Sequence, residues 1–280
     1  GWKGLGCIGA AISLSISRTM QSVVYFLFMF VWKQHHIQSW PEGGWSLQHH
    51  TKARTREFMK QSLPNLGTLL FSVISSQATT VLTGRLGERA IAASSALSTV
   101  SMPWSGTLAA TTSTISGVRV GYHLGRGDGT AAKRTVWMVM HFISIVMVVV
   151  AVVLVPFRHG ILQVATDDVD VLSLSVILIP AMLIGTYLNL MVGNITSGVF
   201  SGMGRPILAT ILSFGFELPM SIGGVAIYIL VFHGNLLGVY WWTAISGFIE
   251  VIVVLILLFA SDWEHWALEA QRRQAPHPQV

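Results

Sequence analysis

Charged side chains are scarce in this sequence of 280 residues. They make up 10% of it, whereas about a quarter is usual in soluble domains. Hydrophobic residues reach 52%, and the mean hydropathy is +0.63. This composition excludes an ordinary soluble domain and predicts an integral membrane protein, with the lipid bilayer as its first partner.

Several signatures of soluble chemistry are also absent from the sequence. Cys7 is the single cysteine, which excludes an internal disulfide. The histidine pairs at 35–36 and 49–50 have no Cys or carboxylate ligands at a metal-binding spacing. No Walker-type Gly-Lys-Ser/Thr ending occurs, and no nucleophile and base stand at a recognisable spacing. We therefore expect no metal site, no cofactor and no enzymatic activity.

What the sequence does have is a series of long apolar runs. A helix needs about 20 mostly apolar residues to cross a bilayer. Seven runs reach this length, at residues 4–32, 61–84, 90–118, 135–157, 171–204, 206–232 and 235–261. The sequence thus predicts an all-α, multi-pass protein with seven transmembrane helices, and it favours neither the plasma membrane nor a vacuolar membrane.

The basic residues between the runs predict the orientation, because Lys and Arg are retained on the cytoplasmic side. If the chain starts outside, twelve Lys and Arg residues fall in inner segments and four in outer segments. The basic residues therefore alternate with apolar runs and do not form one basic face. This pattern argues against a nucleic-acid partner.

A glycine-rich basic stretch, GVRVGYHLGRGDGTAAKR, separates two of the runs at residues 117–134. The predicted cytoplasmic position of its Arg-Gly-Asp tripeptide excludes an extracellular adhesion partner. We predict a tight inner loop whose glycines permit left-handed backbone angles and whose cations hold it at the anionic leaflet. The residues that define this loop motif are Arg119, Gly121, Gly125 and Gly127.

Several motifs resemble, in order and spacing, those of the multidrug and toxic compound extrusion transporters. Residues 119–128 are similar to the family's junction between helices eight and nine, and residues 82–87 to the end of helix seven. Residues 197–206 resemble the turn between helices ten and eleven. The helix eleven proline of the family matches residues 217–219, and the start of its helix twelve matches residues 237–241. The resemblance covers nearly the whole chain as helices six to twelve.

The resemblance implies a division into two lobes. Residues 1–32 would be the last helix of the N-terminal lobe, 33–60 a cytoplasmic inter-lobe loop, 61–261 a complete six-helix lobe, and 262–280 a cytoplasmic tail. The first helix starts outside without a signal peptide. We therefore expect the sequence to be the later part of a longer protein, whose missing N-terminal lobe is a further partner.

The resemblance also implies a function. It predicts a secondary active antiporter that exports xenobiotics or organic cations in exchange for protons or sodium, by alternating access between the lobes. A lipid-linked saccharide flippase of the same superfamily is an alternative, but it would need a strongly cationic cavity, and the runs offer only Arg18. An inactive, incomplete lobe is the other alternative.

Arg18, Glu217 and Glu250 lie near the middle of their runs. An isolated charge there costs about 2.5–3.5 kcal/mol and normally faces a cavity or a partner. Glu217, beside the helix-distorting Pro219, could bind a proton or a cation. Either glutamate could instead be neutralised by a neighbouring helix, with Arg18 as a candidate partner.

The acidic residues that the family places on helices seven and ten have no counterparts at the matching positions. The resemblance puts Ser72 and Gln77 at the helix seven positions, and Asn189 and Asn194 beside the helix ten position. None of them releases a proton, so coupling resides in the missing lobe, has moved to Glu217, or is lost. The amides could bind substrate in a water-filled cleft or pair with neighbouring helices.

The predicted orientation can be tested by cysteine labelling. A cysteine engineered near Gly127 should react with a membrane-impermeant maleimide only when the cytoplasmic face is accessible. Labelling from outside sealed cells would contradict the proposed topology.

Overall fold

The computed structural model describes residues 6–35, 37 and 51–274, and every regular element in these ranges is a helix. The chain forms two compact units, residues 1–57 and 58–280. The first unit holds α1 (Gly6–Phe26) and its π-helical continuation η1 (Leu27–Trp32). Helix α3 (Lys52–Gly84) begins in the first unit and contributes most of its length to the second.

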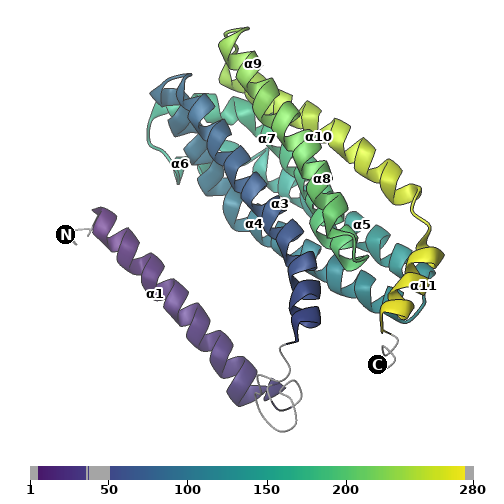
Figure 1. The fold of residues 1–280 in the computed structure, drawn as a ribbon. Coiled ribbons are helices and arrows are strands. Elements are labelled where there is room, and N and C mark those ends of the chain that lie inside the picture. Colours follow the sequence, from purple (N-terminus) through teal and green to yellow (C-terminus); the bar gives the residue numbers. More distant parts are fainter. Residues whose placement is uncertain (1–5, 36, 38–50, 275–280) are drawn as a thin grey trace. The chain divides into compact units, whose positions relative to one another are not determined.

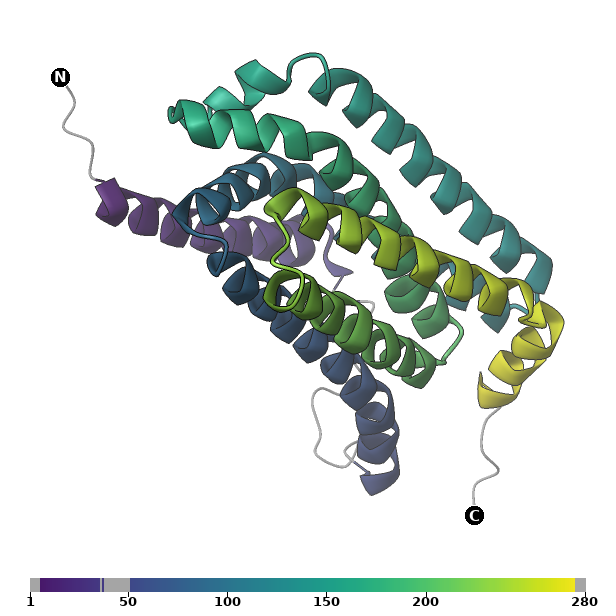
Figure 2. The ribbon, with the colours of Figure 1, turned by 90° about the horizontal axis from the view of Figure 1, so that it is seen from above.

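The second unit is a bundle of long helices, which Figures 1 and 2 show from two directions. Helix α7 continues into η3, and helices α8, η4 and α9 follow one another without a loop. The remaining elements are α4 (Glu88–Gly125), α5 (Gly129–Leu154), α6 (Arg158–Gln163), α7 (Val169–Gly193), η3 (Asn194–Phe200), α8 (Pro206–Phe216), η4 (Glu217–Gly223), α9 (Gly224–Leu230), α10 (Leu236–Phe259) and α11 (Trp263–Gln274).

Helix α7 with η3 forms the centre of this bundle. It packs along α10 and α4, and η3 also contacts α8. In its most apolar stretch, 50% is buried, compared with 24% or less in the corresponding stretches of the other segments that are apolar enough to cross a membrane. The side chains of Leu178, Ile179, Ile195 and Phe200 are almost fully buried, so this segment carries the core.

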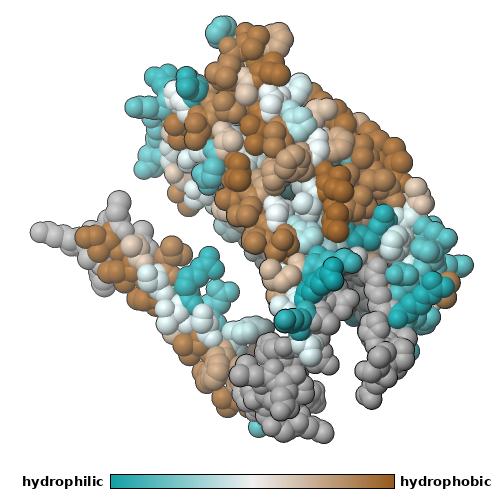
Figure 3. Space-filling view, in the orientation of Figure 1, coloured by the Kyte–Doolittle hydropathy of each residue, from teal (hydrophilic) through white to brown (hydrophobic). Residues whose placement is uncertain are grey.

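Within the described residues, six helical segments are long and apolar enough to cross a membrane, and they correspond to six of the seven predicted runs. Apolar residues cover the side of the bundle in Figure 3, and hydrophilic residues gather at its ends, including the end that carries α11. The remaining run, at residues 90–118, corresponds to α4, which at 38 residues is long enough to span a bilayer. Its many Ser, Thr and Gly residues make it the least apolar of the long helices in the second unit apart from α3.

The inner loop predicted over residues 119–134 is wrong in extent. Arg119, Gly121 and Gly125 are helical, because α4 continues to Gly125 and α5 already begins at Gly129. The turn is limited to three residues, in which Gly127 has a φ of 81°, the left-handed conformation expected of glycine here. Asp128 then caps α5, since its Oδ1 accepts a hydrogen bond of 2.8 Å from the backbone N–H of Ala131.

Two other predicted boundaries differ from the structure. Helix α3 begins at Lys52, so the last nine residues of the predicted loop 33–60 are helical. Hydropathy marks only the apolar part of a helix, and no glycine or proline interrupts residues 52–60. Most of the remaining loop, including three of its four paired histidines, lies outside the described residues. The predicted tail contains a further helix, α11, at 263–274.

Helix α11 packs against α4 and α5. Trp263 and Ala267 are buried in the main core. The guanidinium of Arg205 lies 4.5 Å from the ring centroid of Trp266, a cation–π contact with the turn before α8. Helix α11 therefore contacts α4, α5 and the turn before α8.

Two glycine pairs allow α4 and η3 to approach each other closely. Gly117 and Gly121 on α4 face Gly198 and Gly202 on the segment that includes η3. A Cβ added at Gly202 would lie 2.6 Å from the carbonyl oxygen of Gly117, and one at Gly198 would lie 2.7 Å from that of Ser113. Both pairs have the Gly-x-x-x-Gly spacing that places small residues on one helix face.

Replacing Gly202 with alanine should destabilise the protein, because backbone atoms would have to move apart. We expect a loss of about 1–3 kcal/mol, the usual cost of overpacking, seen as a lower Tm in detergent. Gly215→Ala in α8 is the matched control, since a Cβ there meets nothing within 4 Å. Equal Tm values for the two variants would contradict the close contact.

Candidate functional site

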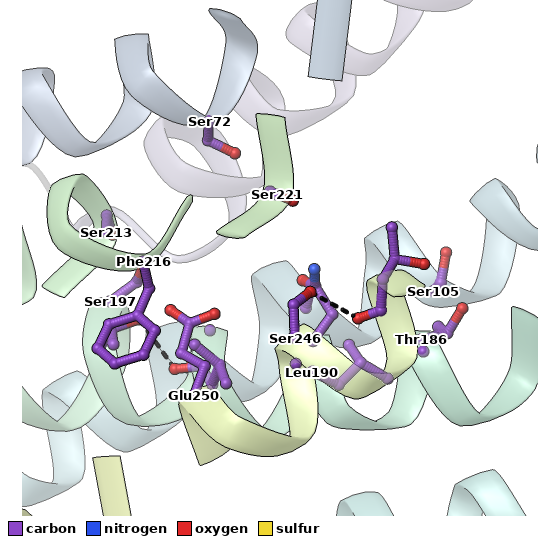
Figure 4. Close-up of a pocket in the computed structure, with 18 of the residues that line it drawn as sticks. Ser72, Ser105, Thr186, Leu190, Ser197, Ser213, Phe216, Ser221, Ser246 and Glu250 are labelled. Carbon is purple, nitrogen blue, oxygen red and sulfur yellow. Dashed lines mark hydrogen bonds between the residues drawn. The ribbon is translucent and has the colours of Figure 1, made fainter. Parts of the chain in front are cut away.

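A cavity of about 780 Å³ lies within the second unit (Figure 4). Its walls come from α3, α4, α7 with η3, α8 with η4, and α10. Cavities that bind small molecules usually measure about 300–1,000 Å³, so this one is large enough for a drug-sized ligand. It is the candidate functional site.

Helical periodicity explains why α10 and α4 line this cavity. Positions i, i+3, i+4 and i+7 share one face of an α-helix. On α10 this face presents Thr243, Ser246 and Glu250 together with Gly247, and on α4 it is formed by Met102, Ser105, Gly106 and Ala109. In Figure 4 the Glu250 carboxylate points away from α10 into the space that the lining helices enclose.

The wall formed by η4 depends on an irregular backbone. Pro219 has no N–H group for helical hydrogen bonding, and the segment that contains it is a π-helix. The indole Nε1 of Trp242 on α10 donates a 2.8 Å hydrogen bond to the carbonyl oxygen of Met220. A Cβ at Gly224 would lie 2.3 Å from the Trp242 ring, so glycine is needed for this approach. Trp242 thereby stabilises the part of the wall that carries Met220 and Ser221.

Helix α3 is attached to α8 beside the cavity. The Thr210 hydroxyl on α8 donates a 2.8 Å hydrogen bond to the carbonyl oxygen of Pro64 and lies 3.0 Å from the Thr68 hydroxyl. The rings of Phe71 and Phe214 meet edge to face, with their centroids 4.5 Å apart. These contacts hold the α3 side of the cavity in place.

The cavity wall is polar but carries little charge. Glu250 is the sole Asp, Glu, Lys, Arg or His among the described residues that line it. The amides of Asn65 and Asn189 add polar groups. Most of the polarity comes from eleven serine and threonine side chains: Thr68, Ser72, Ser105, Thr186, Thr196, Ser197, Ser201, Ser213, Ser221, Thr243 and Ser246.

The structure brings together three of the predicted site residues. Ser72, Asn189 and Glu250 all line the cavity, on α3, α7 and α10 respectively. Gln77 is exposed on α3 and is not part of the cavity wall. These placements show proximity only, and a role in binding remains a prediction for each residue.

Asn194 lies in the core rather than in the cavity wall. Its side chain is 1% exposed, and its Oδ1 accepts a 2.7 Å hydrogen bond from the hydroxyl of Ser116 on α4. Among the described residues, its Nδ2 has no hydrogen-bond partner. The packing interpretation therefore describes this residue better than direct substrate contact, because a side chain so buried is not accessible from the cavity.

The other two membrane charges are placed differently. Arg18 lies on α1 in the first unit, where its Nη1 donates a 3.5 Å hydrogen bond to Oε1 of Gln21. The backbone of Glu217 begins η4, but its side chain lies outside the described residues. The pairing of Arg18 with a membrane glutamate, and a cation-binding role for Glu217, stay predictions.

Sequence reasoning missed most of the cavity wall, although a signal was present. Thr243, Ser246 and Glu250 share one face of a predicted span, which is a direct indication of a polar surface. The same argument identifies Ser105 on α4.

Helices long and apolar enough to cross a membrane surround a polar cavity, which is the architecture of an integral membrane protein with an internal binding space. The family model MatE matches residues 64–222, which is more than half of the chain. The chain therefore belongs to the multidrug and toxin extrusion (MATE) family, and it is a multi-pass integral membrane protein. The resemblance predicted from the motifs is confirmed.

Individual relatives agree with this assignment. The chain is 24% identical over 291 residues to Multidrug and toxin extrusion protein 1 of Xenopus tropicalis, covering 99% of this chain and 47% of that protein. It is 26% identical over 282 residues to Protein DETOXIFICATION 10 of Arabidopsis thaliana, covering 98% and 55%. The chain thus spans about half the length of the curated relatives it matches.

Solved structures share the fold. The crystal structure of the eukaryotic MATE transporter AtDTX14 superimposes with a TM-score of 0.76 at 18% identity, covering 96% of this chain and 59% of that one. An outward-facing multidrug resistance MATE family transporter gives a TM-score of 0.65 at 16% identity, covering 72% and 44%. The predicted all-α membrane fold is confirmed, and the chain matches about half of each of these two structures.

The buried pair of Ser116 and Asn194 can be tested by a double-mutant cycle. Ser116→Ala should lower the free energy of unfolding by about 0.6–1.7 kcal/mol, because Asn194 would lose its partner inside the bundle. In an Asn194→Leu background the same change should have a much smaller effect. Additive losses, measured by unfolding in detergent, would show that the two side chains are not coupled.

Proposed function

We propose that this chain is the cation-binding lobe of a secondary active transporter. In the complete protein, the lobe binds small organic cations or amphipathic xenobiotics and exports them in exchange for protons or sodium. The observation that carries this proposal is the position of Glu250. Among the described lining residues of this cavity of about 780 Å³, Glu250 is the one with a carboxylate, and it points into the enclosed space in Figure 4.

Electrostatics supports a cationic ligand in this cavity. A carboxylate within a membrane is expensive to maintain and usually marks an ion or substrate pathway. The surrounding hydroxyls and amides are neutral, so the described wall carries a net negative charge. An anionic lipid-linked saccharide would find no basic partner among these residues, and the flippase alternative is therefore not supported by the cavity.

The same residue is the best candidate for ion coupling within this lobe. The predicted helix seven positions hold Ser72 and Gln77, which do not titrate. Glu250 could exchange a proton or sodium ion for a substrate cation, because one carboxylate cannot neutralise both at the same time. Alternating access then needs a second lobe to open and close the cavity, and the chain spans about half the length of the curated relatives it matches.

The proposal predicts the effect of removing one charge. In cells that express the protein carrying this chain, Glu250→Gln should lower the efflux rate of a fluorescent organic cation about tenfold or more. Losing a charged hydrogen-bond partner weakens binding by this order. Glu264→Gln, at an exposed position of α11, removes the same charge outside the cavity and should leave efflux unchanged.

The dependence on an ion gradient separates transport from simple binding. Efflux by the unmodified protein should stop when both the proton and the sodium gradients are dissipated. Efflux that persists without either gradient, or that is equally affected by Glu250→Gln and Glu264→Gln, would contradict the proposed antiport.

A further inference from the structure

Resting on the proposed function, we propose that the cavity selects cations that carry N–H groups, such as primary ammonium or guanidinium ions, over quaternary ammonium ions of similar size. The inference concerns the direction of the hydrogen bonds in the wall. It is carried by the hydroxyls beside Glu250 and by the small number of aromatic side chains.

The hydroxyls nearest Glu250 in sequence are already used as donors. Ser246 Oγ donates a 3.0 Å hydrogen bond to the carbonyl oxygen of Thr243, as Figure 4 shows, and Thr243 Oγ1 donates a 2.8 Å hydrogen bond to that of Tyr240. Both side chains line the cavity. A hydroxyl has one proton but two lone pairs. With the proton used by the backbone, the oxygen can only accept further hydrogen bonds.

Three other lining hydroxyls also use their protons within the protein. Thr196 Oγ1 on η3 donates to the carbonyl oxygen of Val192 at 2.8 Å. Thr68 Oγ1 on α3 donates to that of Pro64 at 3.1 Å, and Ser201 Oγ, just beyond η3, donates to the side-chain Oδ1 of Asn65 at 3.5 Å. Five of the eleven lining Ser and Thr hydroxyls are therefore acceptors toward a ligand, and the other six can rotate to accept as well.

Fixed donors are few in comparison. Of the side chains that line the cavity in the described part of the chain, only the amides of Asn65 and Asn189 carry N–H groups. A cation with several N–H groups can donate to these hydroxyl oxygens, whereas a quaternary ammonium ion has no N–H to donate.

The aromatic content of the wall leads to the same conclusion. Quaternary ammonium groups are typically recognised by cages of several aromatic rings. Only Phe216 and Tyr240 contribute aromatic rings to the described lining. The indole of Trp242 is oriented toward η4, where its Nε1 donates to Met220. The cavity thus lacks the usual means of binding a quaternary ion while offering many oxygen acceptors.

The test compares two cations that share the same ring and charge, in one of which three N-methyl groups replace the three N–H groups of the other. Binding of cyclohexylammonium and of cyclohexyltrimethylammonium to the purified chain in lipid nanodiscs is measured by isothermal titration calorimetry at pH 7. We expect the primary ammonium ion to bind about tenfold more tightly or better, since it can make charge-assisted hydrogen bonds. This comparison uses the unmodified protein and does not depend on a variant that folds.

Two variants assign the preference to the wall. Thr243→Val and Ser246→Ala remove acceptor oxygens with little change in volume, and each should weaken primary ammonium binding several-fold while leaving trimethylammonium binding unchanged. Thr114→Val is the matched control, because Thr114 makes the same backbone hydrogen bond on α4, at 2.7 Å to Ala110, but does not line the cavity. Circular dichroism confirms that each variant is folded.

The outcomes separate this inference from the proposed function. If both cations bind equally, or if the quaternary ion binds more tightly, the selectivity is overturned, while cation binding that is lost in Glu250→Gln still supports the proposed function. If neither cation binds, the proposed cation-binding lobe is itself contradicted, and the selectivity falls with it.

Discussion

The close contact between α4 and η3 is the constraint on which the rest of the bundle depends. Between transmembrane helices there is little hydrophobic driving force, so backbone proximity and packing must hold them together. Gly117 and Gly121 meet Gly198 and Gly202 at distances that leave no room for a Cβ at the last two positions. The central helix α7 and its continuation η3 are thereby fixed against α4. Helix α10 packs along α7 as well.

This contact also explains the unusual composition of α4. The C-terminal half of the helix must carry small residues to meet η3, and its middle lines the cavity with Ser105 and Gly106. Neither stretch can be filled with large apolar side chains on this side, so the helix has a low mean hydropathy although it lies in an apolar bundle. Ser and Thr are tolerated there because their hydroxyls bond to backbone carbonyls one turn earlier, as Thr112 does with Leu108 at 2.7 Å.

The sequence alone predicted the helical spans well, because hydropathy over about 20 residues is a strong signal when no water competes for the backbone. The exact ends were less predictable. Arg119 and Lys60 are charged, yet both belong to helices that extend beyond the apolar region. Local propensity rather than hydropathy decides where such a helix ends, and only the three residues from Arg126 to Asp128 form the turn.

The site was harder to predict than the fold, because a cavity depends on which faces of distant helices meet. Ser72, Asn189 and Glu250 could be selected as polar residues within apolar runs, but Asn194 has the same sequence character and is packed against Ser116 instead. Its position on the π-helical segment η3 differs from that on a regular helix, and such a change of phase has no clear sequence signal.

The low water content of a membrane interior determines which hydrogen bonds the hydroxyl groups in the wall of such a cavity make. Hydroxyl groups on the helices cannot rely on bulk water, and donation to a nearby carbonyl is the closest way to satisfy the proton. Each oxygen that does so retains lone pairs toward the cavity, as Thr243 and Ser246 do beside Glu250. The requirement to satisfy donors within the helices thus produces an acceptor-rich wall, and that wall favours a ligand that brings its own N–H groups and positive charge.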